Sequence, residues 1–317
     1  MDRLHSMRVF TRIVELGSFS SAARELNLSP AVVTRLLADL EEHLGARLIN
    51  RTTRRLALTD IGELYLERVK QILTEIDEAE ALTSAATSEP RGHLRVLSPP
   101  AFTVHQLAKH LPKFRAQFPR VTLELSSSGP VETVDENFDV SIIQVIRPLP
   151  DGDFVARLLA RTEVIMCASP EYLDLHGRPK SPADMDGHET MRPPFVNEVT
   201  LRRGSFGDDE PEGESVTKKL SRAALSTAHL DTLYAAALAG LGVAALPSFV
   251  VEDALLENAL ERLLPEWQLL TARIYAGMPT RKHVPARTRA FLDFLVQTFG
   301  GQEHDPWLQA AGCETSR

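Results

Sequence analysis

Cysteine and long apolar runs are both scarce in this chain of 317 residues. The two cysteines, Cys167 and Cys313, make no CxxC motif and fit a reducing compartment. No run of about 18 apolar residues is present to span a bilayer, and residues 2–12 are too polar to include the apolar core of a secretory signal. These absences exclude a membrane-spanning protein, and we expect a cytoplasmic protein that contacts no membrane.

The motifs of common enzyme classes are also missing. There is no HExxH motif, no nucleophile elbow and no P-loop, and the ten histidines are scattered without metal-ligand spacing. Residues 240–245 (GLGVAA) look like a dinucleotide fingerprint, but they follow a predicted helix and open a strand, the reverse of the order that a pyrophosphate site needs. We interpret them as a helix stop and a turn. The sequence therefore predicts no catalytic site, no metal and no cofactor.

Basic residues are concentrated near the N-terminus, although the whole chain has a net charge of −8. Residues 1–58 contain nine Lys or Arg against six Asp or Glu. A local excess of this kind is typical of surfaces that meet phosphates. With 43% hydrophobic residues, the chain is long enough for two or three domains with sizeable cores.

A helix-turn-helix is predicted between Ser18 and Glu42. Ala22, Ala23 and Leu26 predict a short helix whose small residues let a second helix cross it closely. Ser29 is a good N-cap and Pro30 suits the first helical position, so a second helix should run from Pro30 through Glu42. Its core stripe is predicted to be Val33, Leu37, Leu40 and Leu44. The outward face would then be Ala31, Thr34, Arg35 and Ala38, which suits a DNA major groove.

An arginine-rich hairpin is predicted to follow. Gly45 ends the helix, residues 47–49 and 56–58 are expected to be strands, and residues 50–55 form a polar tip. An arginine cluster is often only a solvated face, and short helix pairs are common. Adjacent and in this order, however, the two features favour a winged helix-turn-helix bound to double-stranded DNA. The residues predicted to contact DNA are Ser29, Pro30, Ala31, Thr34, Arg35, Arg51, Thr52, Arg54 and Arg55.

A long amphipathic helix is predicted from Thr59, its cap, to Ala86. Residues 59–90 carry two bases and eight acids, which makes this helix a poor DNA arm. The helix could pack on its own domain, but its length favours pairing with a second copy of the chain. The residues predicted for this dimerisation stripe are Ile61, Tyr65, Val69, Ile72 and Ile76.

After a hinge at residues 88–92, short β-rich runs alternate with helical stretches. Strands are expected at 94–97, 121–125, 140–145, 164–168, 242–246 and 274–276, and helices at 104–118, 230–239 and 287–299. This alternation predicts an α/β domain with largely parallel sheets. Residues 204–215 contain five acids and no base, and a solvated hairpin tip is preferred there over a partner contact.

Several N-terminal segments carry a family resemblance. They are Met7–Phe10, Gly17–Ser20, Ala22–Leu26, Leu40–Gly45, Leu48–Arg54 and Leu58–Gly62. Together they resemble the N-terminal domain of LysR-type transcriptional regulators, and the similarity continues more loosely to about Gly300. The resemblance implies a homodimer or homotetramer that binds an interrupted inverted repeat near a promoter, with RNA polymerase as a further partner.

The resemblance also implies the division of the chain. The expected fold is α+β overall, with a winged helix-turn-helix domain at 1–58, a linker and dimerisation helix at 59–88, and a periplasmic-binding-protein-like α/β effector domain at 92–300. The effector domain would have one subdomain at about 93–162 and 272–299, a second at about 163–271, and a flexible tail after it at 301–317.

Relatives bind small-molecule effectors where loops leave parallel strands, and ligands commonly lie at such places. The corresponding positions here are Ser98, Thr103, Ser127, Gln144 and Thr227, with Phe102 as an apolar wall. Each hydroxyl could instead be a helix cap or turn residue. Ile143 replaces a frequent arginine, so we expect a neutral or singly charged, partly apolar effector. A rival hypothesis is a solute-binding or enzymatic C-terminal domain that the N-terminal unit only tethers to DNA.

Overall fold

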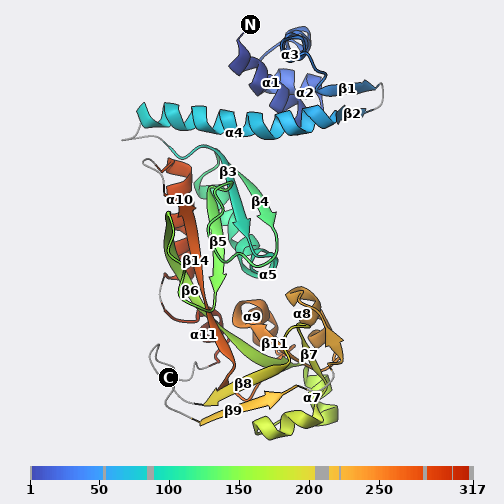
Figure 1. Cartoon of the computed structure of the whole chain (residues 1–317), viewed down its shortest axis with the longest axis vertical. Helices are drawn as coiled ribbons and strands as arrows, with labels where there is room; N and C mark the ends of the chain where they lie inside the picture. The colour runs from blue at the N-terminus through green and yellow to red at the C-terminus, as the bar shows by residue number, and fades with distance from the viewer. Residues whose placement is uncertain are drawn as a thin grey trace. The chain divides into compact units, whose positions relative to one another are not determined.

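The structure of the protein is a computed structural model that describes residues 2–52, 55–83, 89–203, 214–220, 223–280, 284–301 and 303–313. It divides into two compact units, Met1–Gly92 and His93–Arg317, which are labelled by element in Figure 1. Each unit is described by itself.

The N-terminal unit is a helix-turn-helix with a two-stranded wing. Its elements are α1 (Arg3–Leu16), α2 (Phe19–Glu25), α3 (Pro30–Leu44), β1 (Ile49–Thr52), β2 (Arg55–Leu58) and α4 (Asp60–Thr83). The hydroxyl oxygens of Ser18 and Ser29 accept the Ser21 and Val32 N–H groups and so cap α2 and α3. The core of the unit is formed by Val9, Phe10, Ile13, Ala22, Ala23, Val33, Leu37, Leu40, Leu48 and Ile49.

The start of α4 is fastened to the wing. Thr59 Oγ1 accepts the N–H of Gly62 at 2.9 Å, which confirms the predicted cap, and donates to the carbonyl of Arg47 at 2.7 Å. Gly62 lies so close to β1 that a Cβ there would be 2.1 Å from the carbonyl oxygen of Leu48. A glycine is therefore required at this contact, because any side chain would push α4 away from the wing.

The C-terminal unit is built on one mixed sheet. Its strands are β3 (Gly92–Ser98), β4 (Val121–Ser127), β5 (Val140–Val145), β6 (Phe154–Ala168), β7 (Thr190–Arg192), β10 (Leu225–Ser226), β11 (Val243–Pro247), β12 (Glu261–Leu263) and β14 (Leu270–Pro279). The strand order is β10-β7-β11-β6-β14-β5-β3-β4, with β12 paired to β6. A second, three-stranded sheet has the order β13-β8-β9, from β8 (Glu198–Arg203), β9 (Glu214–Lys219) and β13 (Trp267–Gln268).

Two long strands join the halves of this unit, as Figure 1 shows for β6 and β14. The first part of β6 pairs with β14, and its last residues pair with β11 and β12. β14 in turn pairs with β5. We call the half that contains β3, β4 and β5 the first lobe, and the half that contains β7, β10 and β11 the second lobe. The predicted boundaries at 162/163 and 271/272 fall inside β6 and β14.

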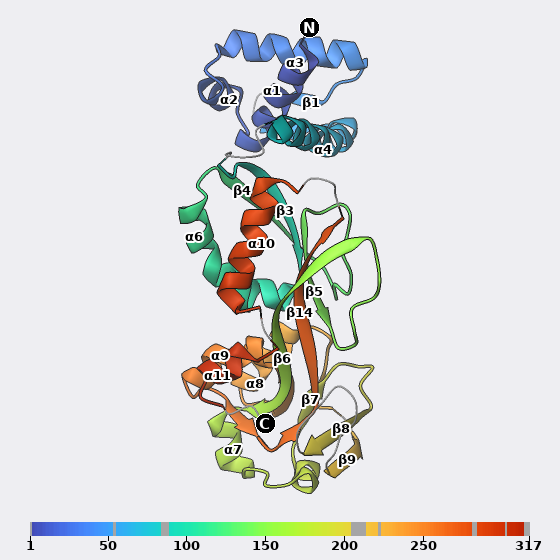
Figure 2. The ribbon, with the colours of Figure 1, turned by 90° about the vertical axis from the view of Figure 1, so that its left-hand side faces the viewer.

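Helices cover both lobes. The first lobe carries α5 (Pro100–Phe102), the π-helical turn η1 (Thr103–Leu107), α6 (Ala108–Gln117) and α10 (Ala286–Phe299). The second carries α7 (Pro170–His176), the 3₁₀ turn η2 (Pro182–Gly187), α8 (Leu230–Leu238) and α9 (Ser248–Leu256), and α11 (Pro306–Ala310) packs on α9. Figure 2 shows α6 and α10 side by side, where Phe114 meets Phe291 and Phe294.

Two predictions for this unit are wrong. The sheet is mixed and not largely parallel, because β6 and β14 run antiparallel to each other and to their other neighbours. Residues 301–317 were expected to be a flexible tail, but α11 lies within them. Trp307 and Leu308 are 3% and 0% exposed, since their side chains enter the main core. The apolar contacts of α11 hold the segment in place.

Candidate DNA-binding face and effector site

The predicted reading face lies on the exposed side of α3. Ser29, Pro30, Ala31 and Arg35 are exposed, and Thr34 is half-buried. The Thr34 hydroxyl donates to the carbonyl of Pro30 at 2.9 Å, so its lone pairs remain available as acceptors. Arg35 extends into solvent with its Nε 4.0 Å from Asp39 Oδ2. The face thus presents one guanidinium and one hydroxyl on a smooth helical surface.

The core stripe of α3 differs from the prediction at its C-terminal end. Val33, Leu37 and Leu40 are buried as predicted, but Leu44 is 37% exposed, because the helix ends at Gly45 in a left-handed turn. The buried residue in the last turn is Glu41, at 6% exposure. Val32, which sequence reasoning did not place on the reading face, is 39% exposed beside Ala31 and adds an apolar contact surface.

Glu41 connects the reading helix to the wing. Its Oε1 accepts the backbone N–H groups of Leu48 at 2.8 Å and Ile49 at 3.2 Å, and its Oε2 lies 3.7 Å from the Arg47 guanidinium. Backbone donors that bond a buried carboxylate are strong contacts. Sequence reasoning missed this residue, because an acid beside Glu42 on a helix looks like part of a solvated face.

The wing strands extend closer to the tip of the hairpin than predicted, since β1 ends at Thr52 and β2 begins at Arg55. β1 and β2 pair in antiparallel register, with Arg51 opposite Leu56 and Thr52 opposite Arg55. The strands begin later than residue 47, since the N–H of Leu48 is bonded to Glu41 and not to the other strand. Arg54 lies outside the described residues, and for Arg51, Thr52 and Arg55 only the backbone is described. Their contact with DNA stays a prediction.

The predicted dimerisation stripe of α4 divides into two sets. Tyr65 packs against Phe10, with ring centroids 5.8 Å apart, and burial raises the pKa of its hydroxyl. Val69 is 0% exposed. Val69 is therefore covered within a single chain, which corrects its assignment to a seam between chains, whereas Tyr65 is half-buried and keeps an exposed part.

The other members of the stripe face outward. Ile61 and Ile72 are 55% and 40% exposed, and Leu64, which was not predicted, is 68% exposed. Ile76 is half-buried. The exposed members, Ile61, Leu64 and Ile72, recur over three turns on one side of the helix, which is the spacing of a surface for a partner helix.

Four predicted effector residues belong to the neighbouring strands β3, β4 and β5 or to the turn after β3. Ser98 ends β3 and is fully buried, with Oγ 3.5 Å from the carbonyl of Pro99. Thr103 Oγ1 donates to the same carbonyl at 3.1 Å and accepts a hydrogen bond from Ser127 Oγ at 3.2 Å. Gln144 lies on β5, the neighbour of β3, and is half-buried.

Thr227 belongs to the second lobe. It follows β10, its N–H donates to the carbonyl of Arg192, and its Oγ1 accepts the N–H of His229 at 3.1 Å. No described hydrogen bond joins Thr227 directly to Ser98 or Thr103. Whether the effector bridges these groups stays a prediction.

Phe102 does not form the wall that was predicted. Its side chain is 1% exposed, and its ring contacts the rings of Phe249, Phe299 and Trp307. Because these rings enclose it, Phe102 is a core residue beneath the loop and offers a ligand no apolar face.

Side chains that sequence reasoning missed join the two lobes near this site. His105 Nε2, on the π-helical turn η1, lies 2.8 Å from Asp231 Oδ1 at the start of α8. The next residue, Gln106, donates to the carbonyl of Phe249 at 2.8 Å and to Glu252 at 2.9 Å. π-Helical turns are frequent at functional sites. This turn lies directly after Thr103, so the lobe contacts are next to the predicted effector residues.

Comparison with known proteins identifies the family. The model of the bacterial regulatory helix-turn-helix protein, LysR family, matches residues 4–63, and that of the LysR substrate-binding domain matches residues 87–300. This chain belongs to the LysR family of transcriptional regulators. It is a DNA-binding regulator with an effector-binding domain, and the expected α+β fold with an N-terminal winged helix-turn-helix is confirmed.

Relatives and solved structures cover almost the whole regulator. It is 34% identical to the transcriptional regulator CrgA of Neisseria meningitidis serogroup C, over 93% of this chain and 96% of CrgA. It is 32% identical to a transcriptional repressor of Pseudomonas aeruginosa, over 94% and 93% of the two chains. A full-length AphB variant matches its fold with a TM-score of 0.57 at 26% identity, covering 94% of this chain and 99% of AphB. In the part of the chain that the structure describes, no helix is long and apolar enough to cross a membrane.

The role of Glu41 is testable. We expect Glu41→Ala to lower the free energy of unfolding of the N-terminal unit by about 2 to 3 kcal/mol, because two buried backbone N–H groups lose their acceptor. Operator affinity should fall as well, since the wing is no longer fixed to α3. Urea denaturation and DNA titration of the full chain measure both effects. Glu42→Ala, an exposed neighbour, is the control, and equal stability of the two variants would contradict the role.

Proposed function

We propose that this regulator reads an interrupted inverted repeat as a homodimer or homotetramer. The exposed face of α3 supports the proposal, because Ala31 and Val32 permit close approach to bases while Thr34 and Arg35 supply hydrogen-bonding groups. The wing arginines, Arg51, Arg54 and Arg55, would bind phosphates or enter the adjacent minor groove. The spacing of the two half-sites would follow from the spacing of two recognition helices.

The oligomer would form along α4. Ile61, Leu64 and Ile72 are exposed apolar side chains on one side of a helix of 24 residues. Pairing of two such helices across a twofold axis buries each stripe against its copy. Ile76, which is half-buried, extends the stripe. We therefore place the seam on these four residues, with the half-buried Tyr65 beside them, and not on the buried Val69.

The effector would bind near the ends of β3, β4 and β5. Thr103 and Ser127 offer hydroxyl groups there, Gln144 an amide, and Thr227 a hydroxyl from the second lobe. Ser98 is fully buried, so the loop after β3 would have to shift for the effector to reach its hydroxyl. Ile143 is fully buried and supplies no cation, so a neutral or singly charged, partly apolar molecule fits best. Binding of such a molecule would change how dimers pack and hence how DNA bends. We further propose that the protein works in the cytoplasm with RNA polymerase and catalyses no reaction.

The first test concerns base reading. We expect Arg35→Ala to weaken binding to a footprinted operator by about 1 to 3 kcal/mol and to weaken binding to random DNA much less, because a base contact discriminates among sequences. Fluorescence anisotropy with both DNAs measures this. Lys219→Ala, a cation on β9, is the matched control. An Arg35→Ala variant with parental operator affinity would remove Arg35 from the reading face.

The second test concerns assembly. A charge at Ile72 would face its copy across the twofold, so Ile72→Glu should separate the chains and abolish operator binding, at a cost of several kcal/mol. Sedimentation velocity and circular dichroism report assembly and folding. Leu175→Glu places the same charge on an exposed apolar residue of the C-terminal unit and should leave the oligomer intact. A folded Ile72→Glu protein that keeps the parental mass would rule out this seam.

The third test locates the effector. A thermal-shift screen of small organic acids and phenols should find a compound that raises the Tm of the parent protein. The increase should shrink in Ser98→Ala and Thr103→Val, because each loses a polar group at the loop. Thr122→Val, at a distant position on β4, should respond as the parent does. Equal stabilisation of the parent, Ser98→Ala and Thr103→Val would mean that the compound binds elsewhere.

A further inference from the structure

The C-terminal segment crosses the strands that join the lobes. The N–H of Arg161 on β6 donates to the carbonyl of His304 at 3.0 Å, and the N–H of Glu163 donates to Asp305 Oδ2 at 2.8 Å. Glu303 accepts from Arg273 of β14 at 2.8 Å. Residues 303–313, which we call the C-terminal strap, are thus bonded to both connecting strands.

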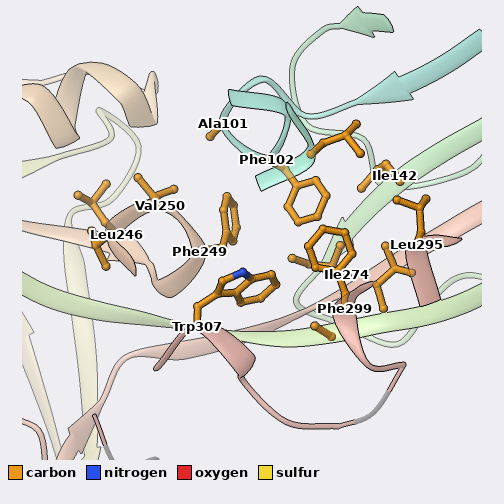
Figure 3. Packing of buried hydrophobic residues seen from close by; sticks show 14 of the residues in the cluster. Ala101, Phe102, Ile142, Leu246, Phe249, Val250, Ile274, Leu295, Phe299 and Trp307 are labelled. Atoms are coloured by element: carbon orange, nitrogen blue, oxygen red, sulfur yellow. The ribbon is translucent and has the colours of Figure 1, made fainter. Parts of the chain in front are cut away.

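The strap also reaches the core beneath the predicted effector loop. Trp307 lies with its ring centroid 5.7 Å from that of Phe249 on α9, 6.2 Å from Phe299 on α10 and 6.4 Å from Phe102 on α5 (Figure 3). Phe102 is the residue before Thr103. A displacement of α11 would therefore remove a packing partner from the loop and from both lobes at once.

Asp305 anchors the strap. Its Oδ1 caps α11 by accepting the N–H groups of Trp307 and Leu308, each at 3.1 Å. Its Oδ2 accepts the N–H of Glu163 and the hydroxyl of Ser248, the latter at 2.7 Å. Four donors suit an ionised carboxylate, which has only acceptor sites. Burial raises the pKa of Asp305, but these four hydrogen bonds oppose that shift by stabilising the anion, so we place the negative charge on Asp305 although the residue is 4% exposed.

Glu163, whose backbone N–H donates to Asp305, is a second buried acid near this one. Glu163 is 3% exposed, and its Oε1 accepts from Arg262 Nη2 at 2.8 Å. The charged groups near it are Arg262 from β12, Arg161 from β6 and Asp305 from the strap. The thiol of Cys313, also from the strap, is near it too. The neutral hydroxyl of Ser248, on α9, is hydrogen-bonded to both Asp305 and Thr162.

Two carboxylates next to each other in a buried site are costly to ionise together. Since Asp305 is bonded as an anion, the proton belongs on Glu163. Burial raises the pKa of Glu163 to about 7, with Arg262 opposing the shift and Asp305 adding to it. Among the residues that the structure describes, the pair Glu303 and Arg273 and the neighbouring His304 are further ionisable groups beside this contact.

We propose that Glu163 binds a proton when the C-terminal strap is seated, and that loss of this proton loosens the strap across the two lobe-connecting strands. The regulator would then contain a pH-sensitive joint between its lobes. The proposed pH dependence of the strap requires no effector. Its influence on the loop at residues 98–103 rests on the proposed effector site.

The direction of the pH effect follows from proton linkage. A carboxyl group that is exposed when the strap opens returns to its ordinary pKa of 4.5, whereas the seated group has a pKa of about 7. Seating is therefore strongest below pH 4.5, weakens as the pH rises between these values, and levels off above about 7. The maximum slope for one proton is a tenfold change in the opening equilibrium per pH unit.

Hydrogen exchange of the full chain measures this opening directly. Protection factors of the Trp307 and Leu308 amides, corrected for the intrinsic pH dependence of exchange, report the opening equilibrium. We expect them to fall by up to about tenfold per unit from pH 5.5 to 6.5 and to flatten above about pH 7. Amides of β5 serve as the internal reference and should show no such slope.

Variants assign the slope to Glu163. Glu163→Gln keeps an acceptor for Arg262 without a titratable proton, so protection of α11 should become independent of pH. Glu303→Gln, in the exposed pair with Arg273, should behave as the parent. If Glu163→Gln does not fold, Arg262→Gln provides the test, because loss of the opposing cation should extend the decline above pH 7.

The outcomes that overturn the proposal are specific. A flat profile for α11 in the parent, an unchanged slope in Glu163→Gln, or disappearance of the slope in His304→Gln would each reject Glu163 as the proton site. None of these measurements uses an effector or an operator, so a failure here leaves the proposed function standing. Conversely, an effector that binds elsewhere would leave the exchange result unaffected.

Discussion

The antiparallel pairing of β6 with β14 is the constraint on which the C-terminal unit depends. The ladder runs from Leu270 opposite Val164 to Pro279 opposite Phe154, with a register shift between Ile274 and Tyr275. The strands of the first lobe, β5-β3-β4, and those of the second, β10-β7-β11, are joined into one sheet only through this pair. The ladder also fixes the positions of the parallel strands at either side. The chain crosses between the lobes in these two strands and again between α10 and α11, so contacts among these segments bear on any relative movement of the lobes.

This arrangement explains why the candidate effector residues come from distant parts of the chain. Ser98 and Ser127 end strands that are neighbours in the sheet, and the loop after β3 brings Thr103 to the hydroxyl of Ser127. Thr227 lies beyond the connecting strands, and the lobes meet through His105 and Asp231 just beside Thr103. A ligand held between the two groups would act on the same contacts that hold the lobes together. Effector binding and the relative position of the lobes would then depend on the same side chains.

Local sequence patterns predicted most of the helices and strands, but few of the side-chain contacts between them. The ends of α3 are set locally, by the Ser29 hydroxyl cap, by Pro30 and by the left-handed Gly45. β5 was predicted with its observed bounds because residues 140–145 form an isolated, mostly apolar run. The role of Glu41 depends on where β1 lies, which no helical pattern contains. The strap was missed because residues 300–305 are glycine-rich and polar. Trp307 is buried because α10 and the more distant α5 and α9 surround it.

Buried carboxylates hold a joint in each unit, and their surroundings give them different properties. Glu41 meets two backbone donors and lies near the guanidinium of Arg47. This contact fixes the wing to α3 through a single carboxylate. Glu163 instead shares its site with Asp305, and one arginine cannot balance both charges. The same side-chain chemistry therefore makes a static joint next to DNA and a proton-dependent joint between the lobes, because the second acid is present only in the latter.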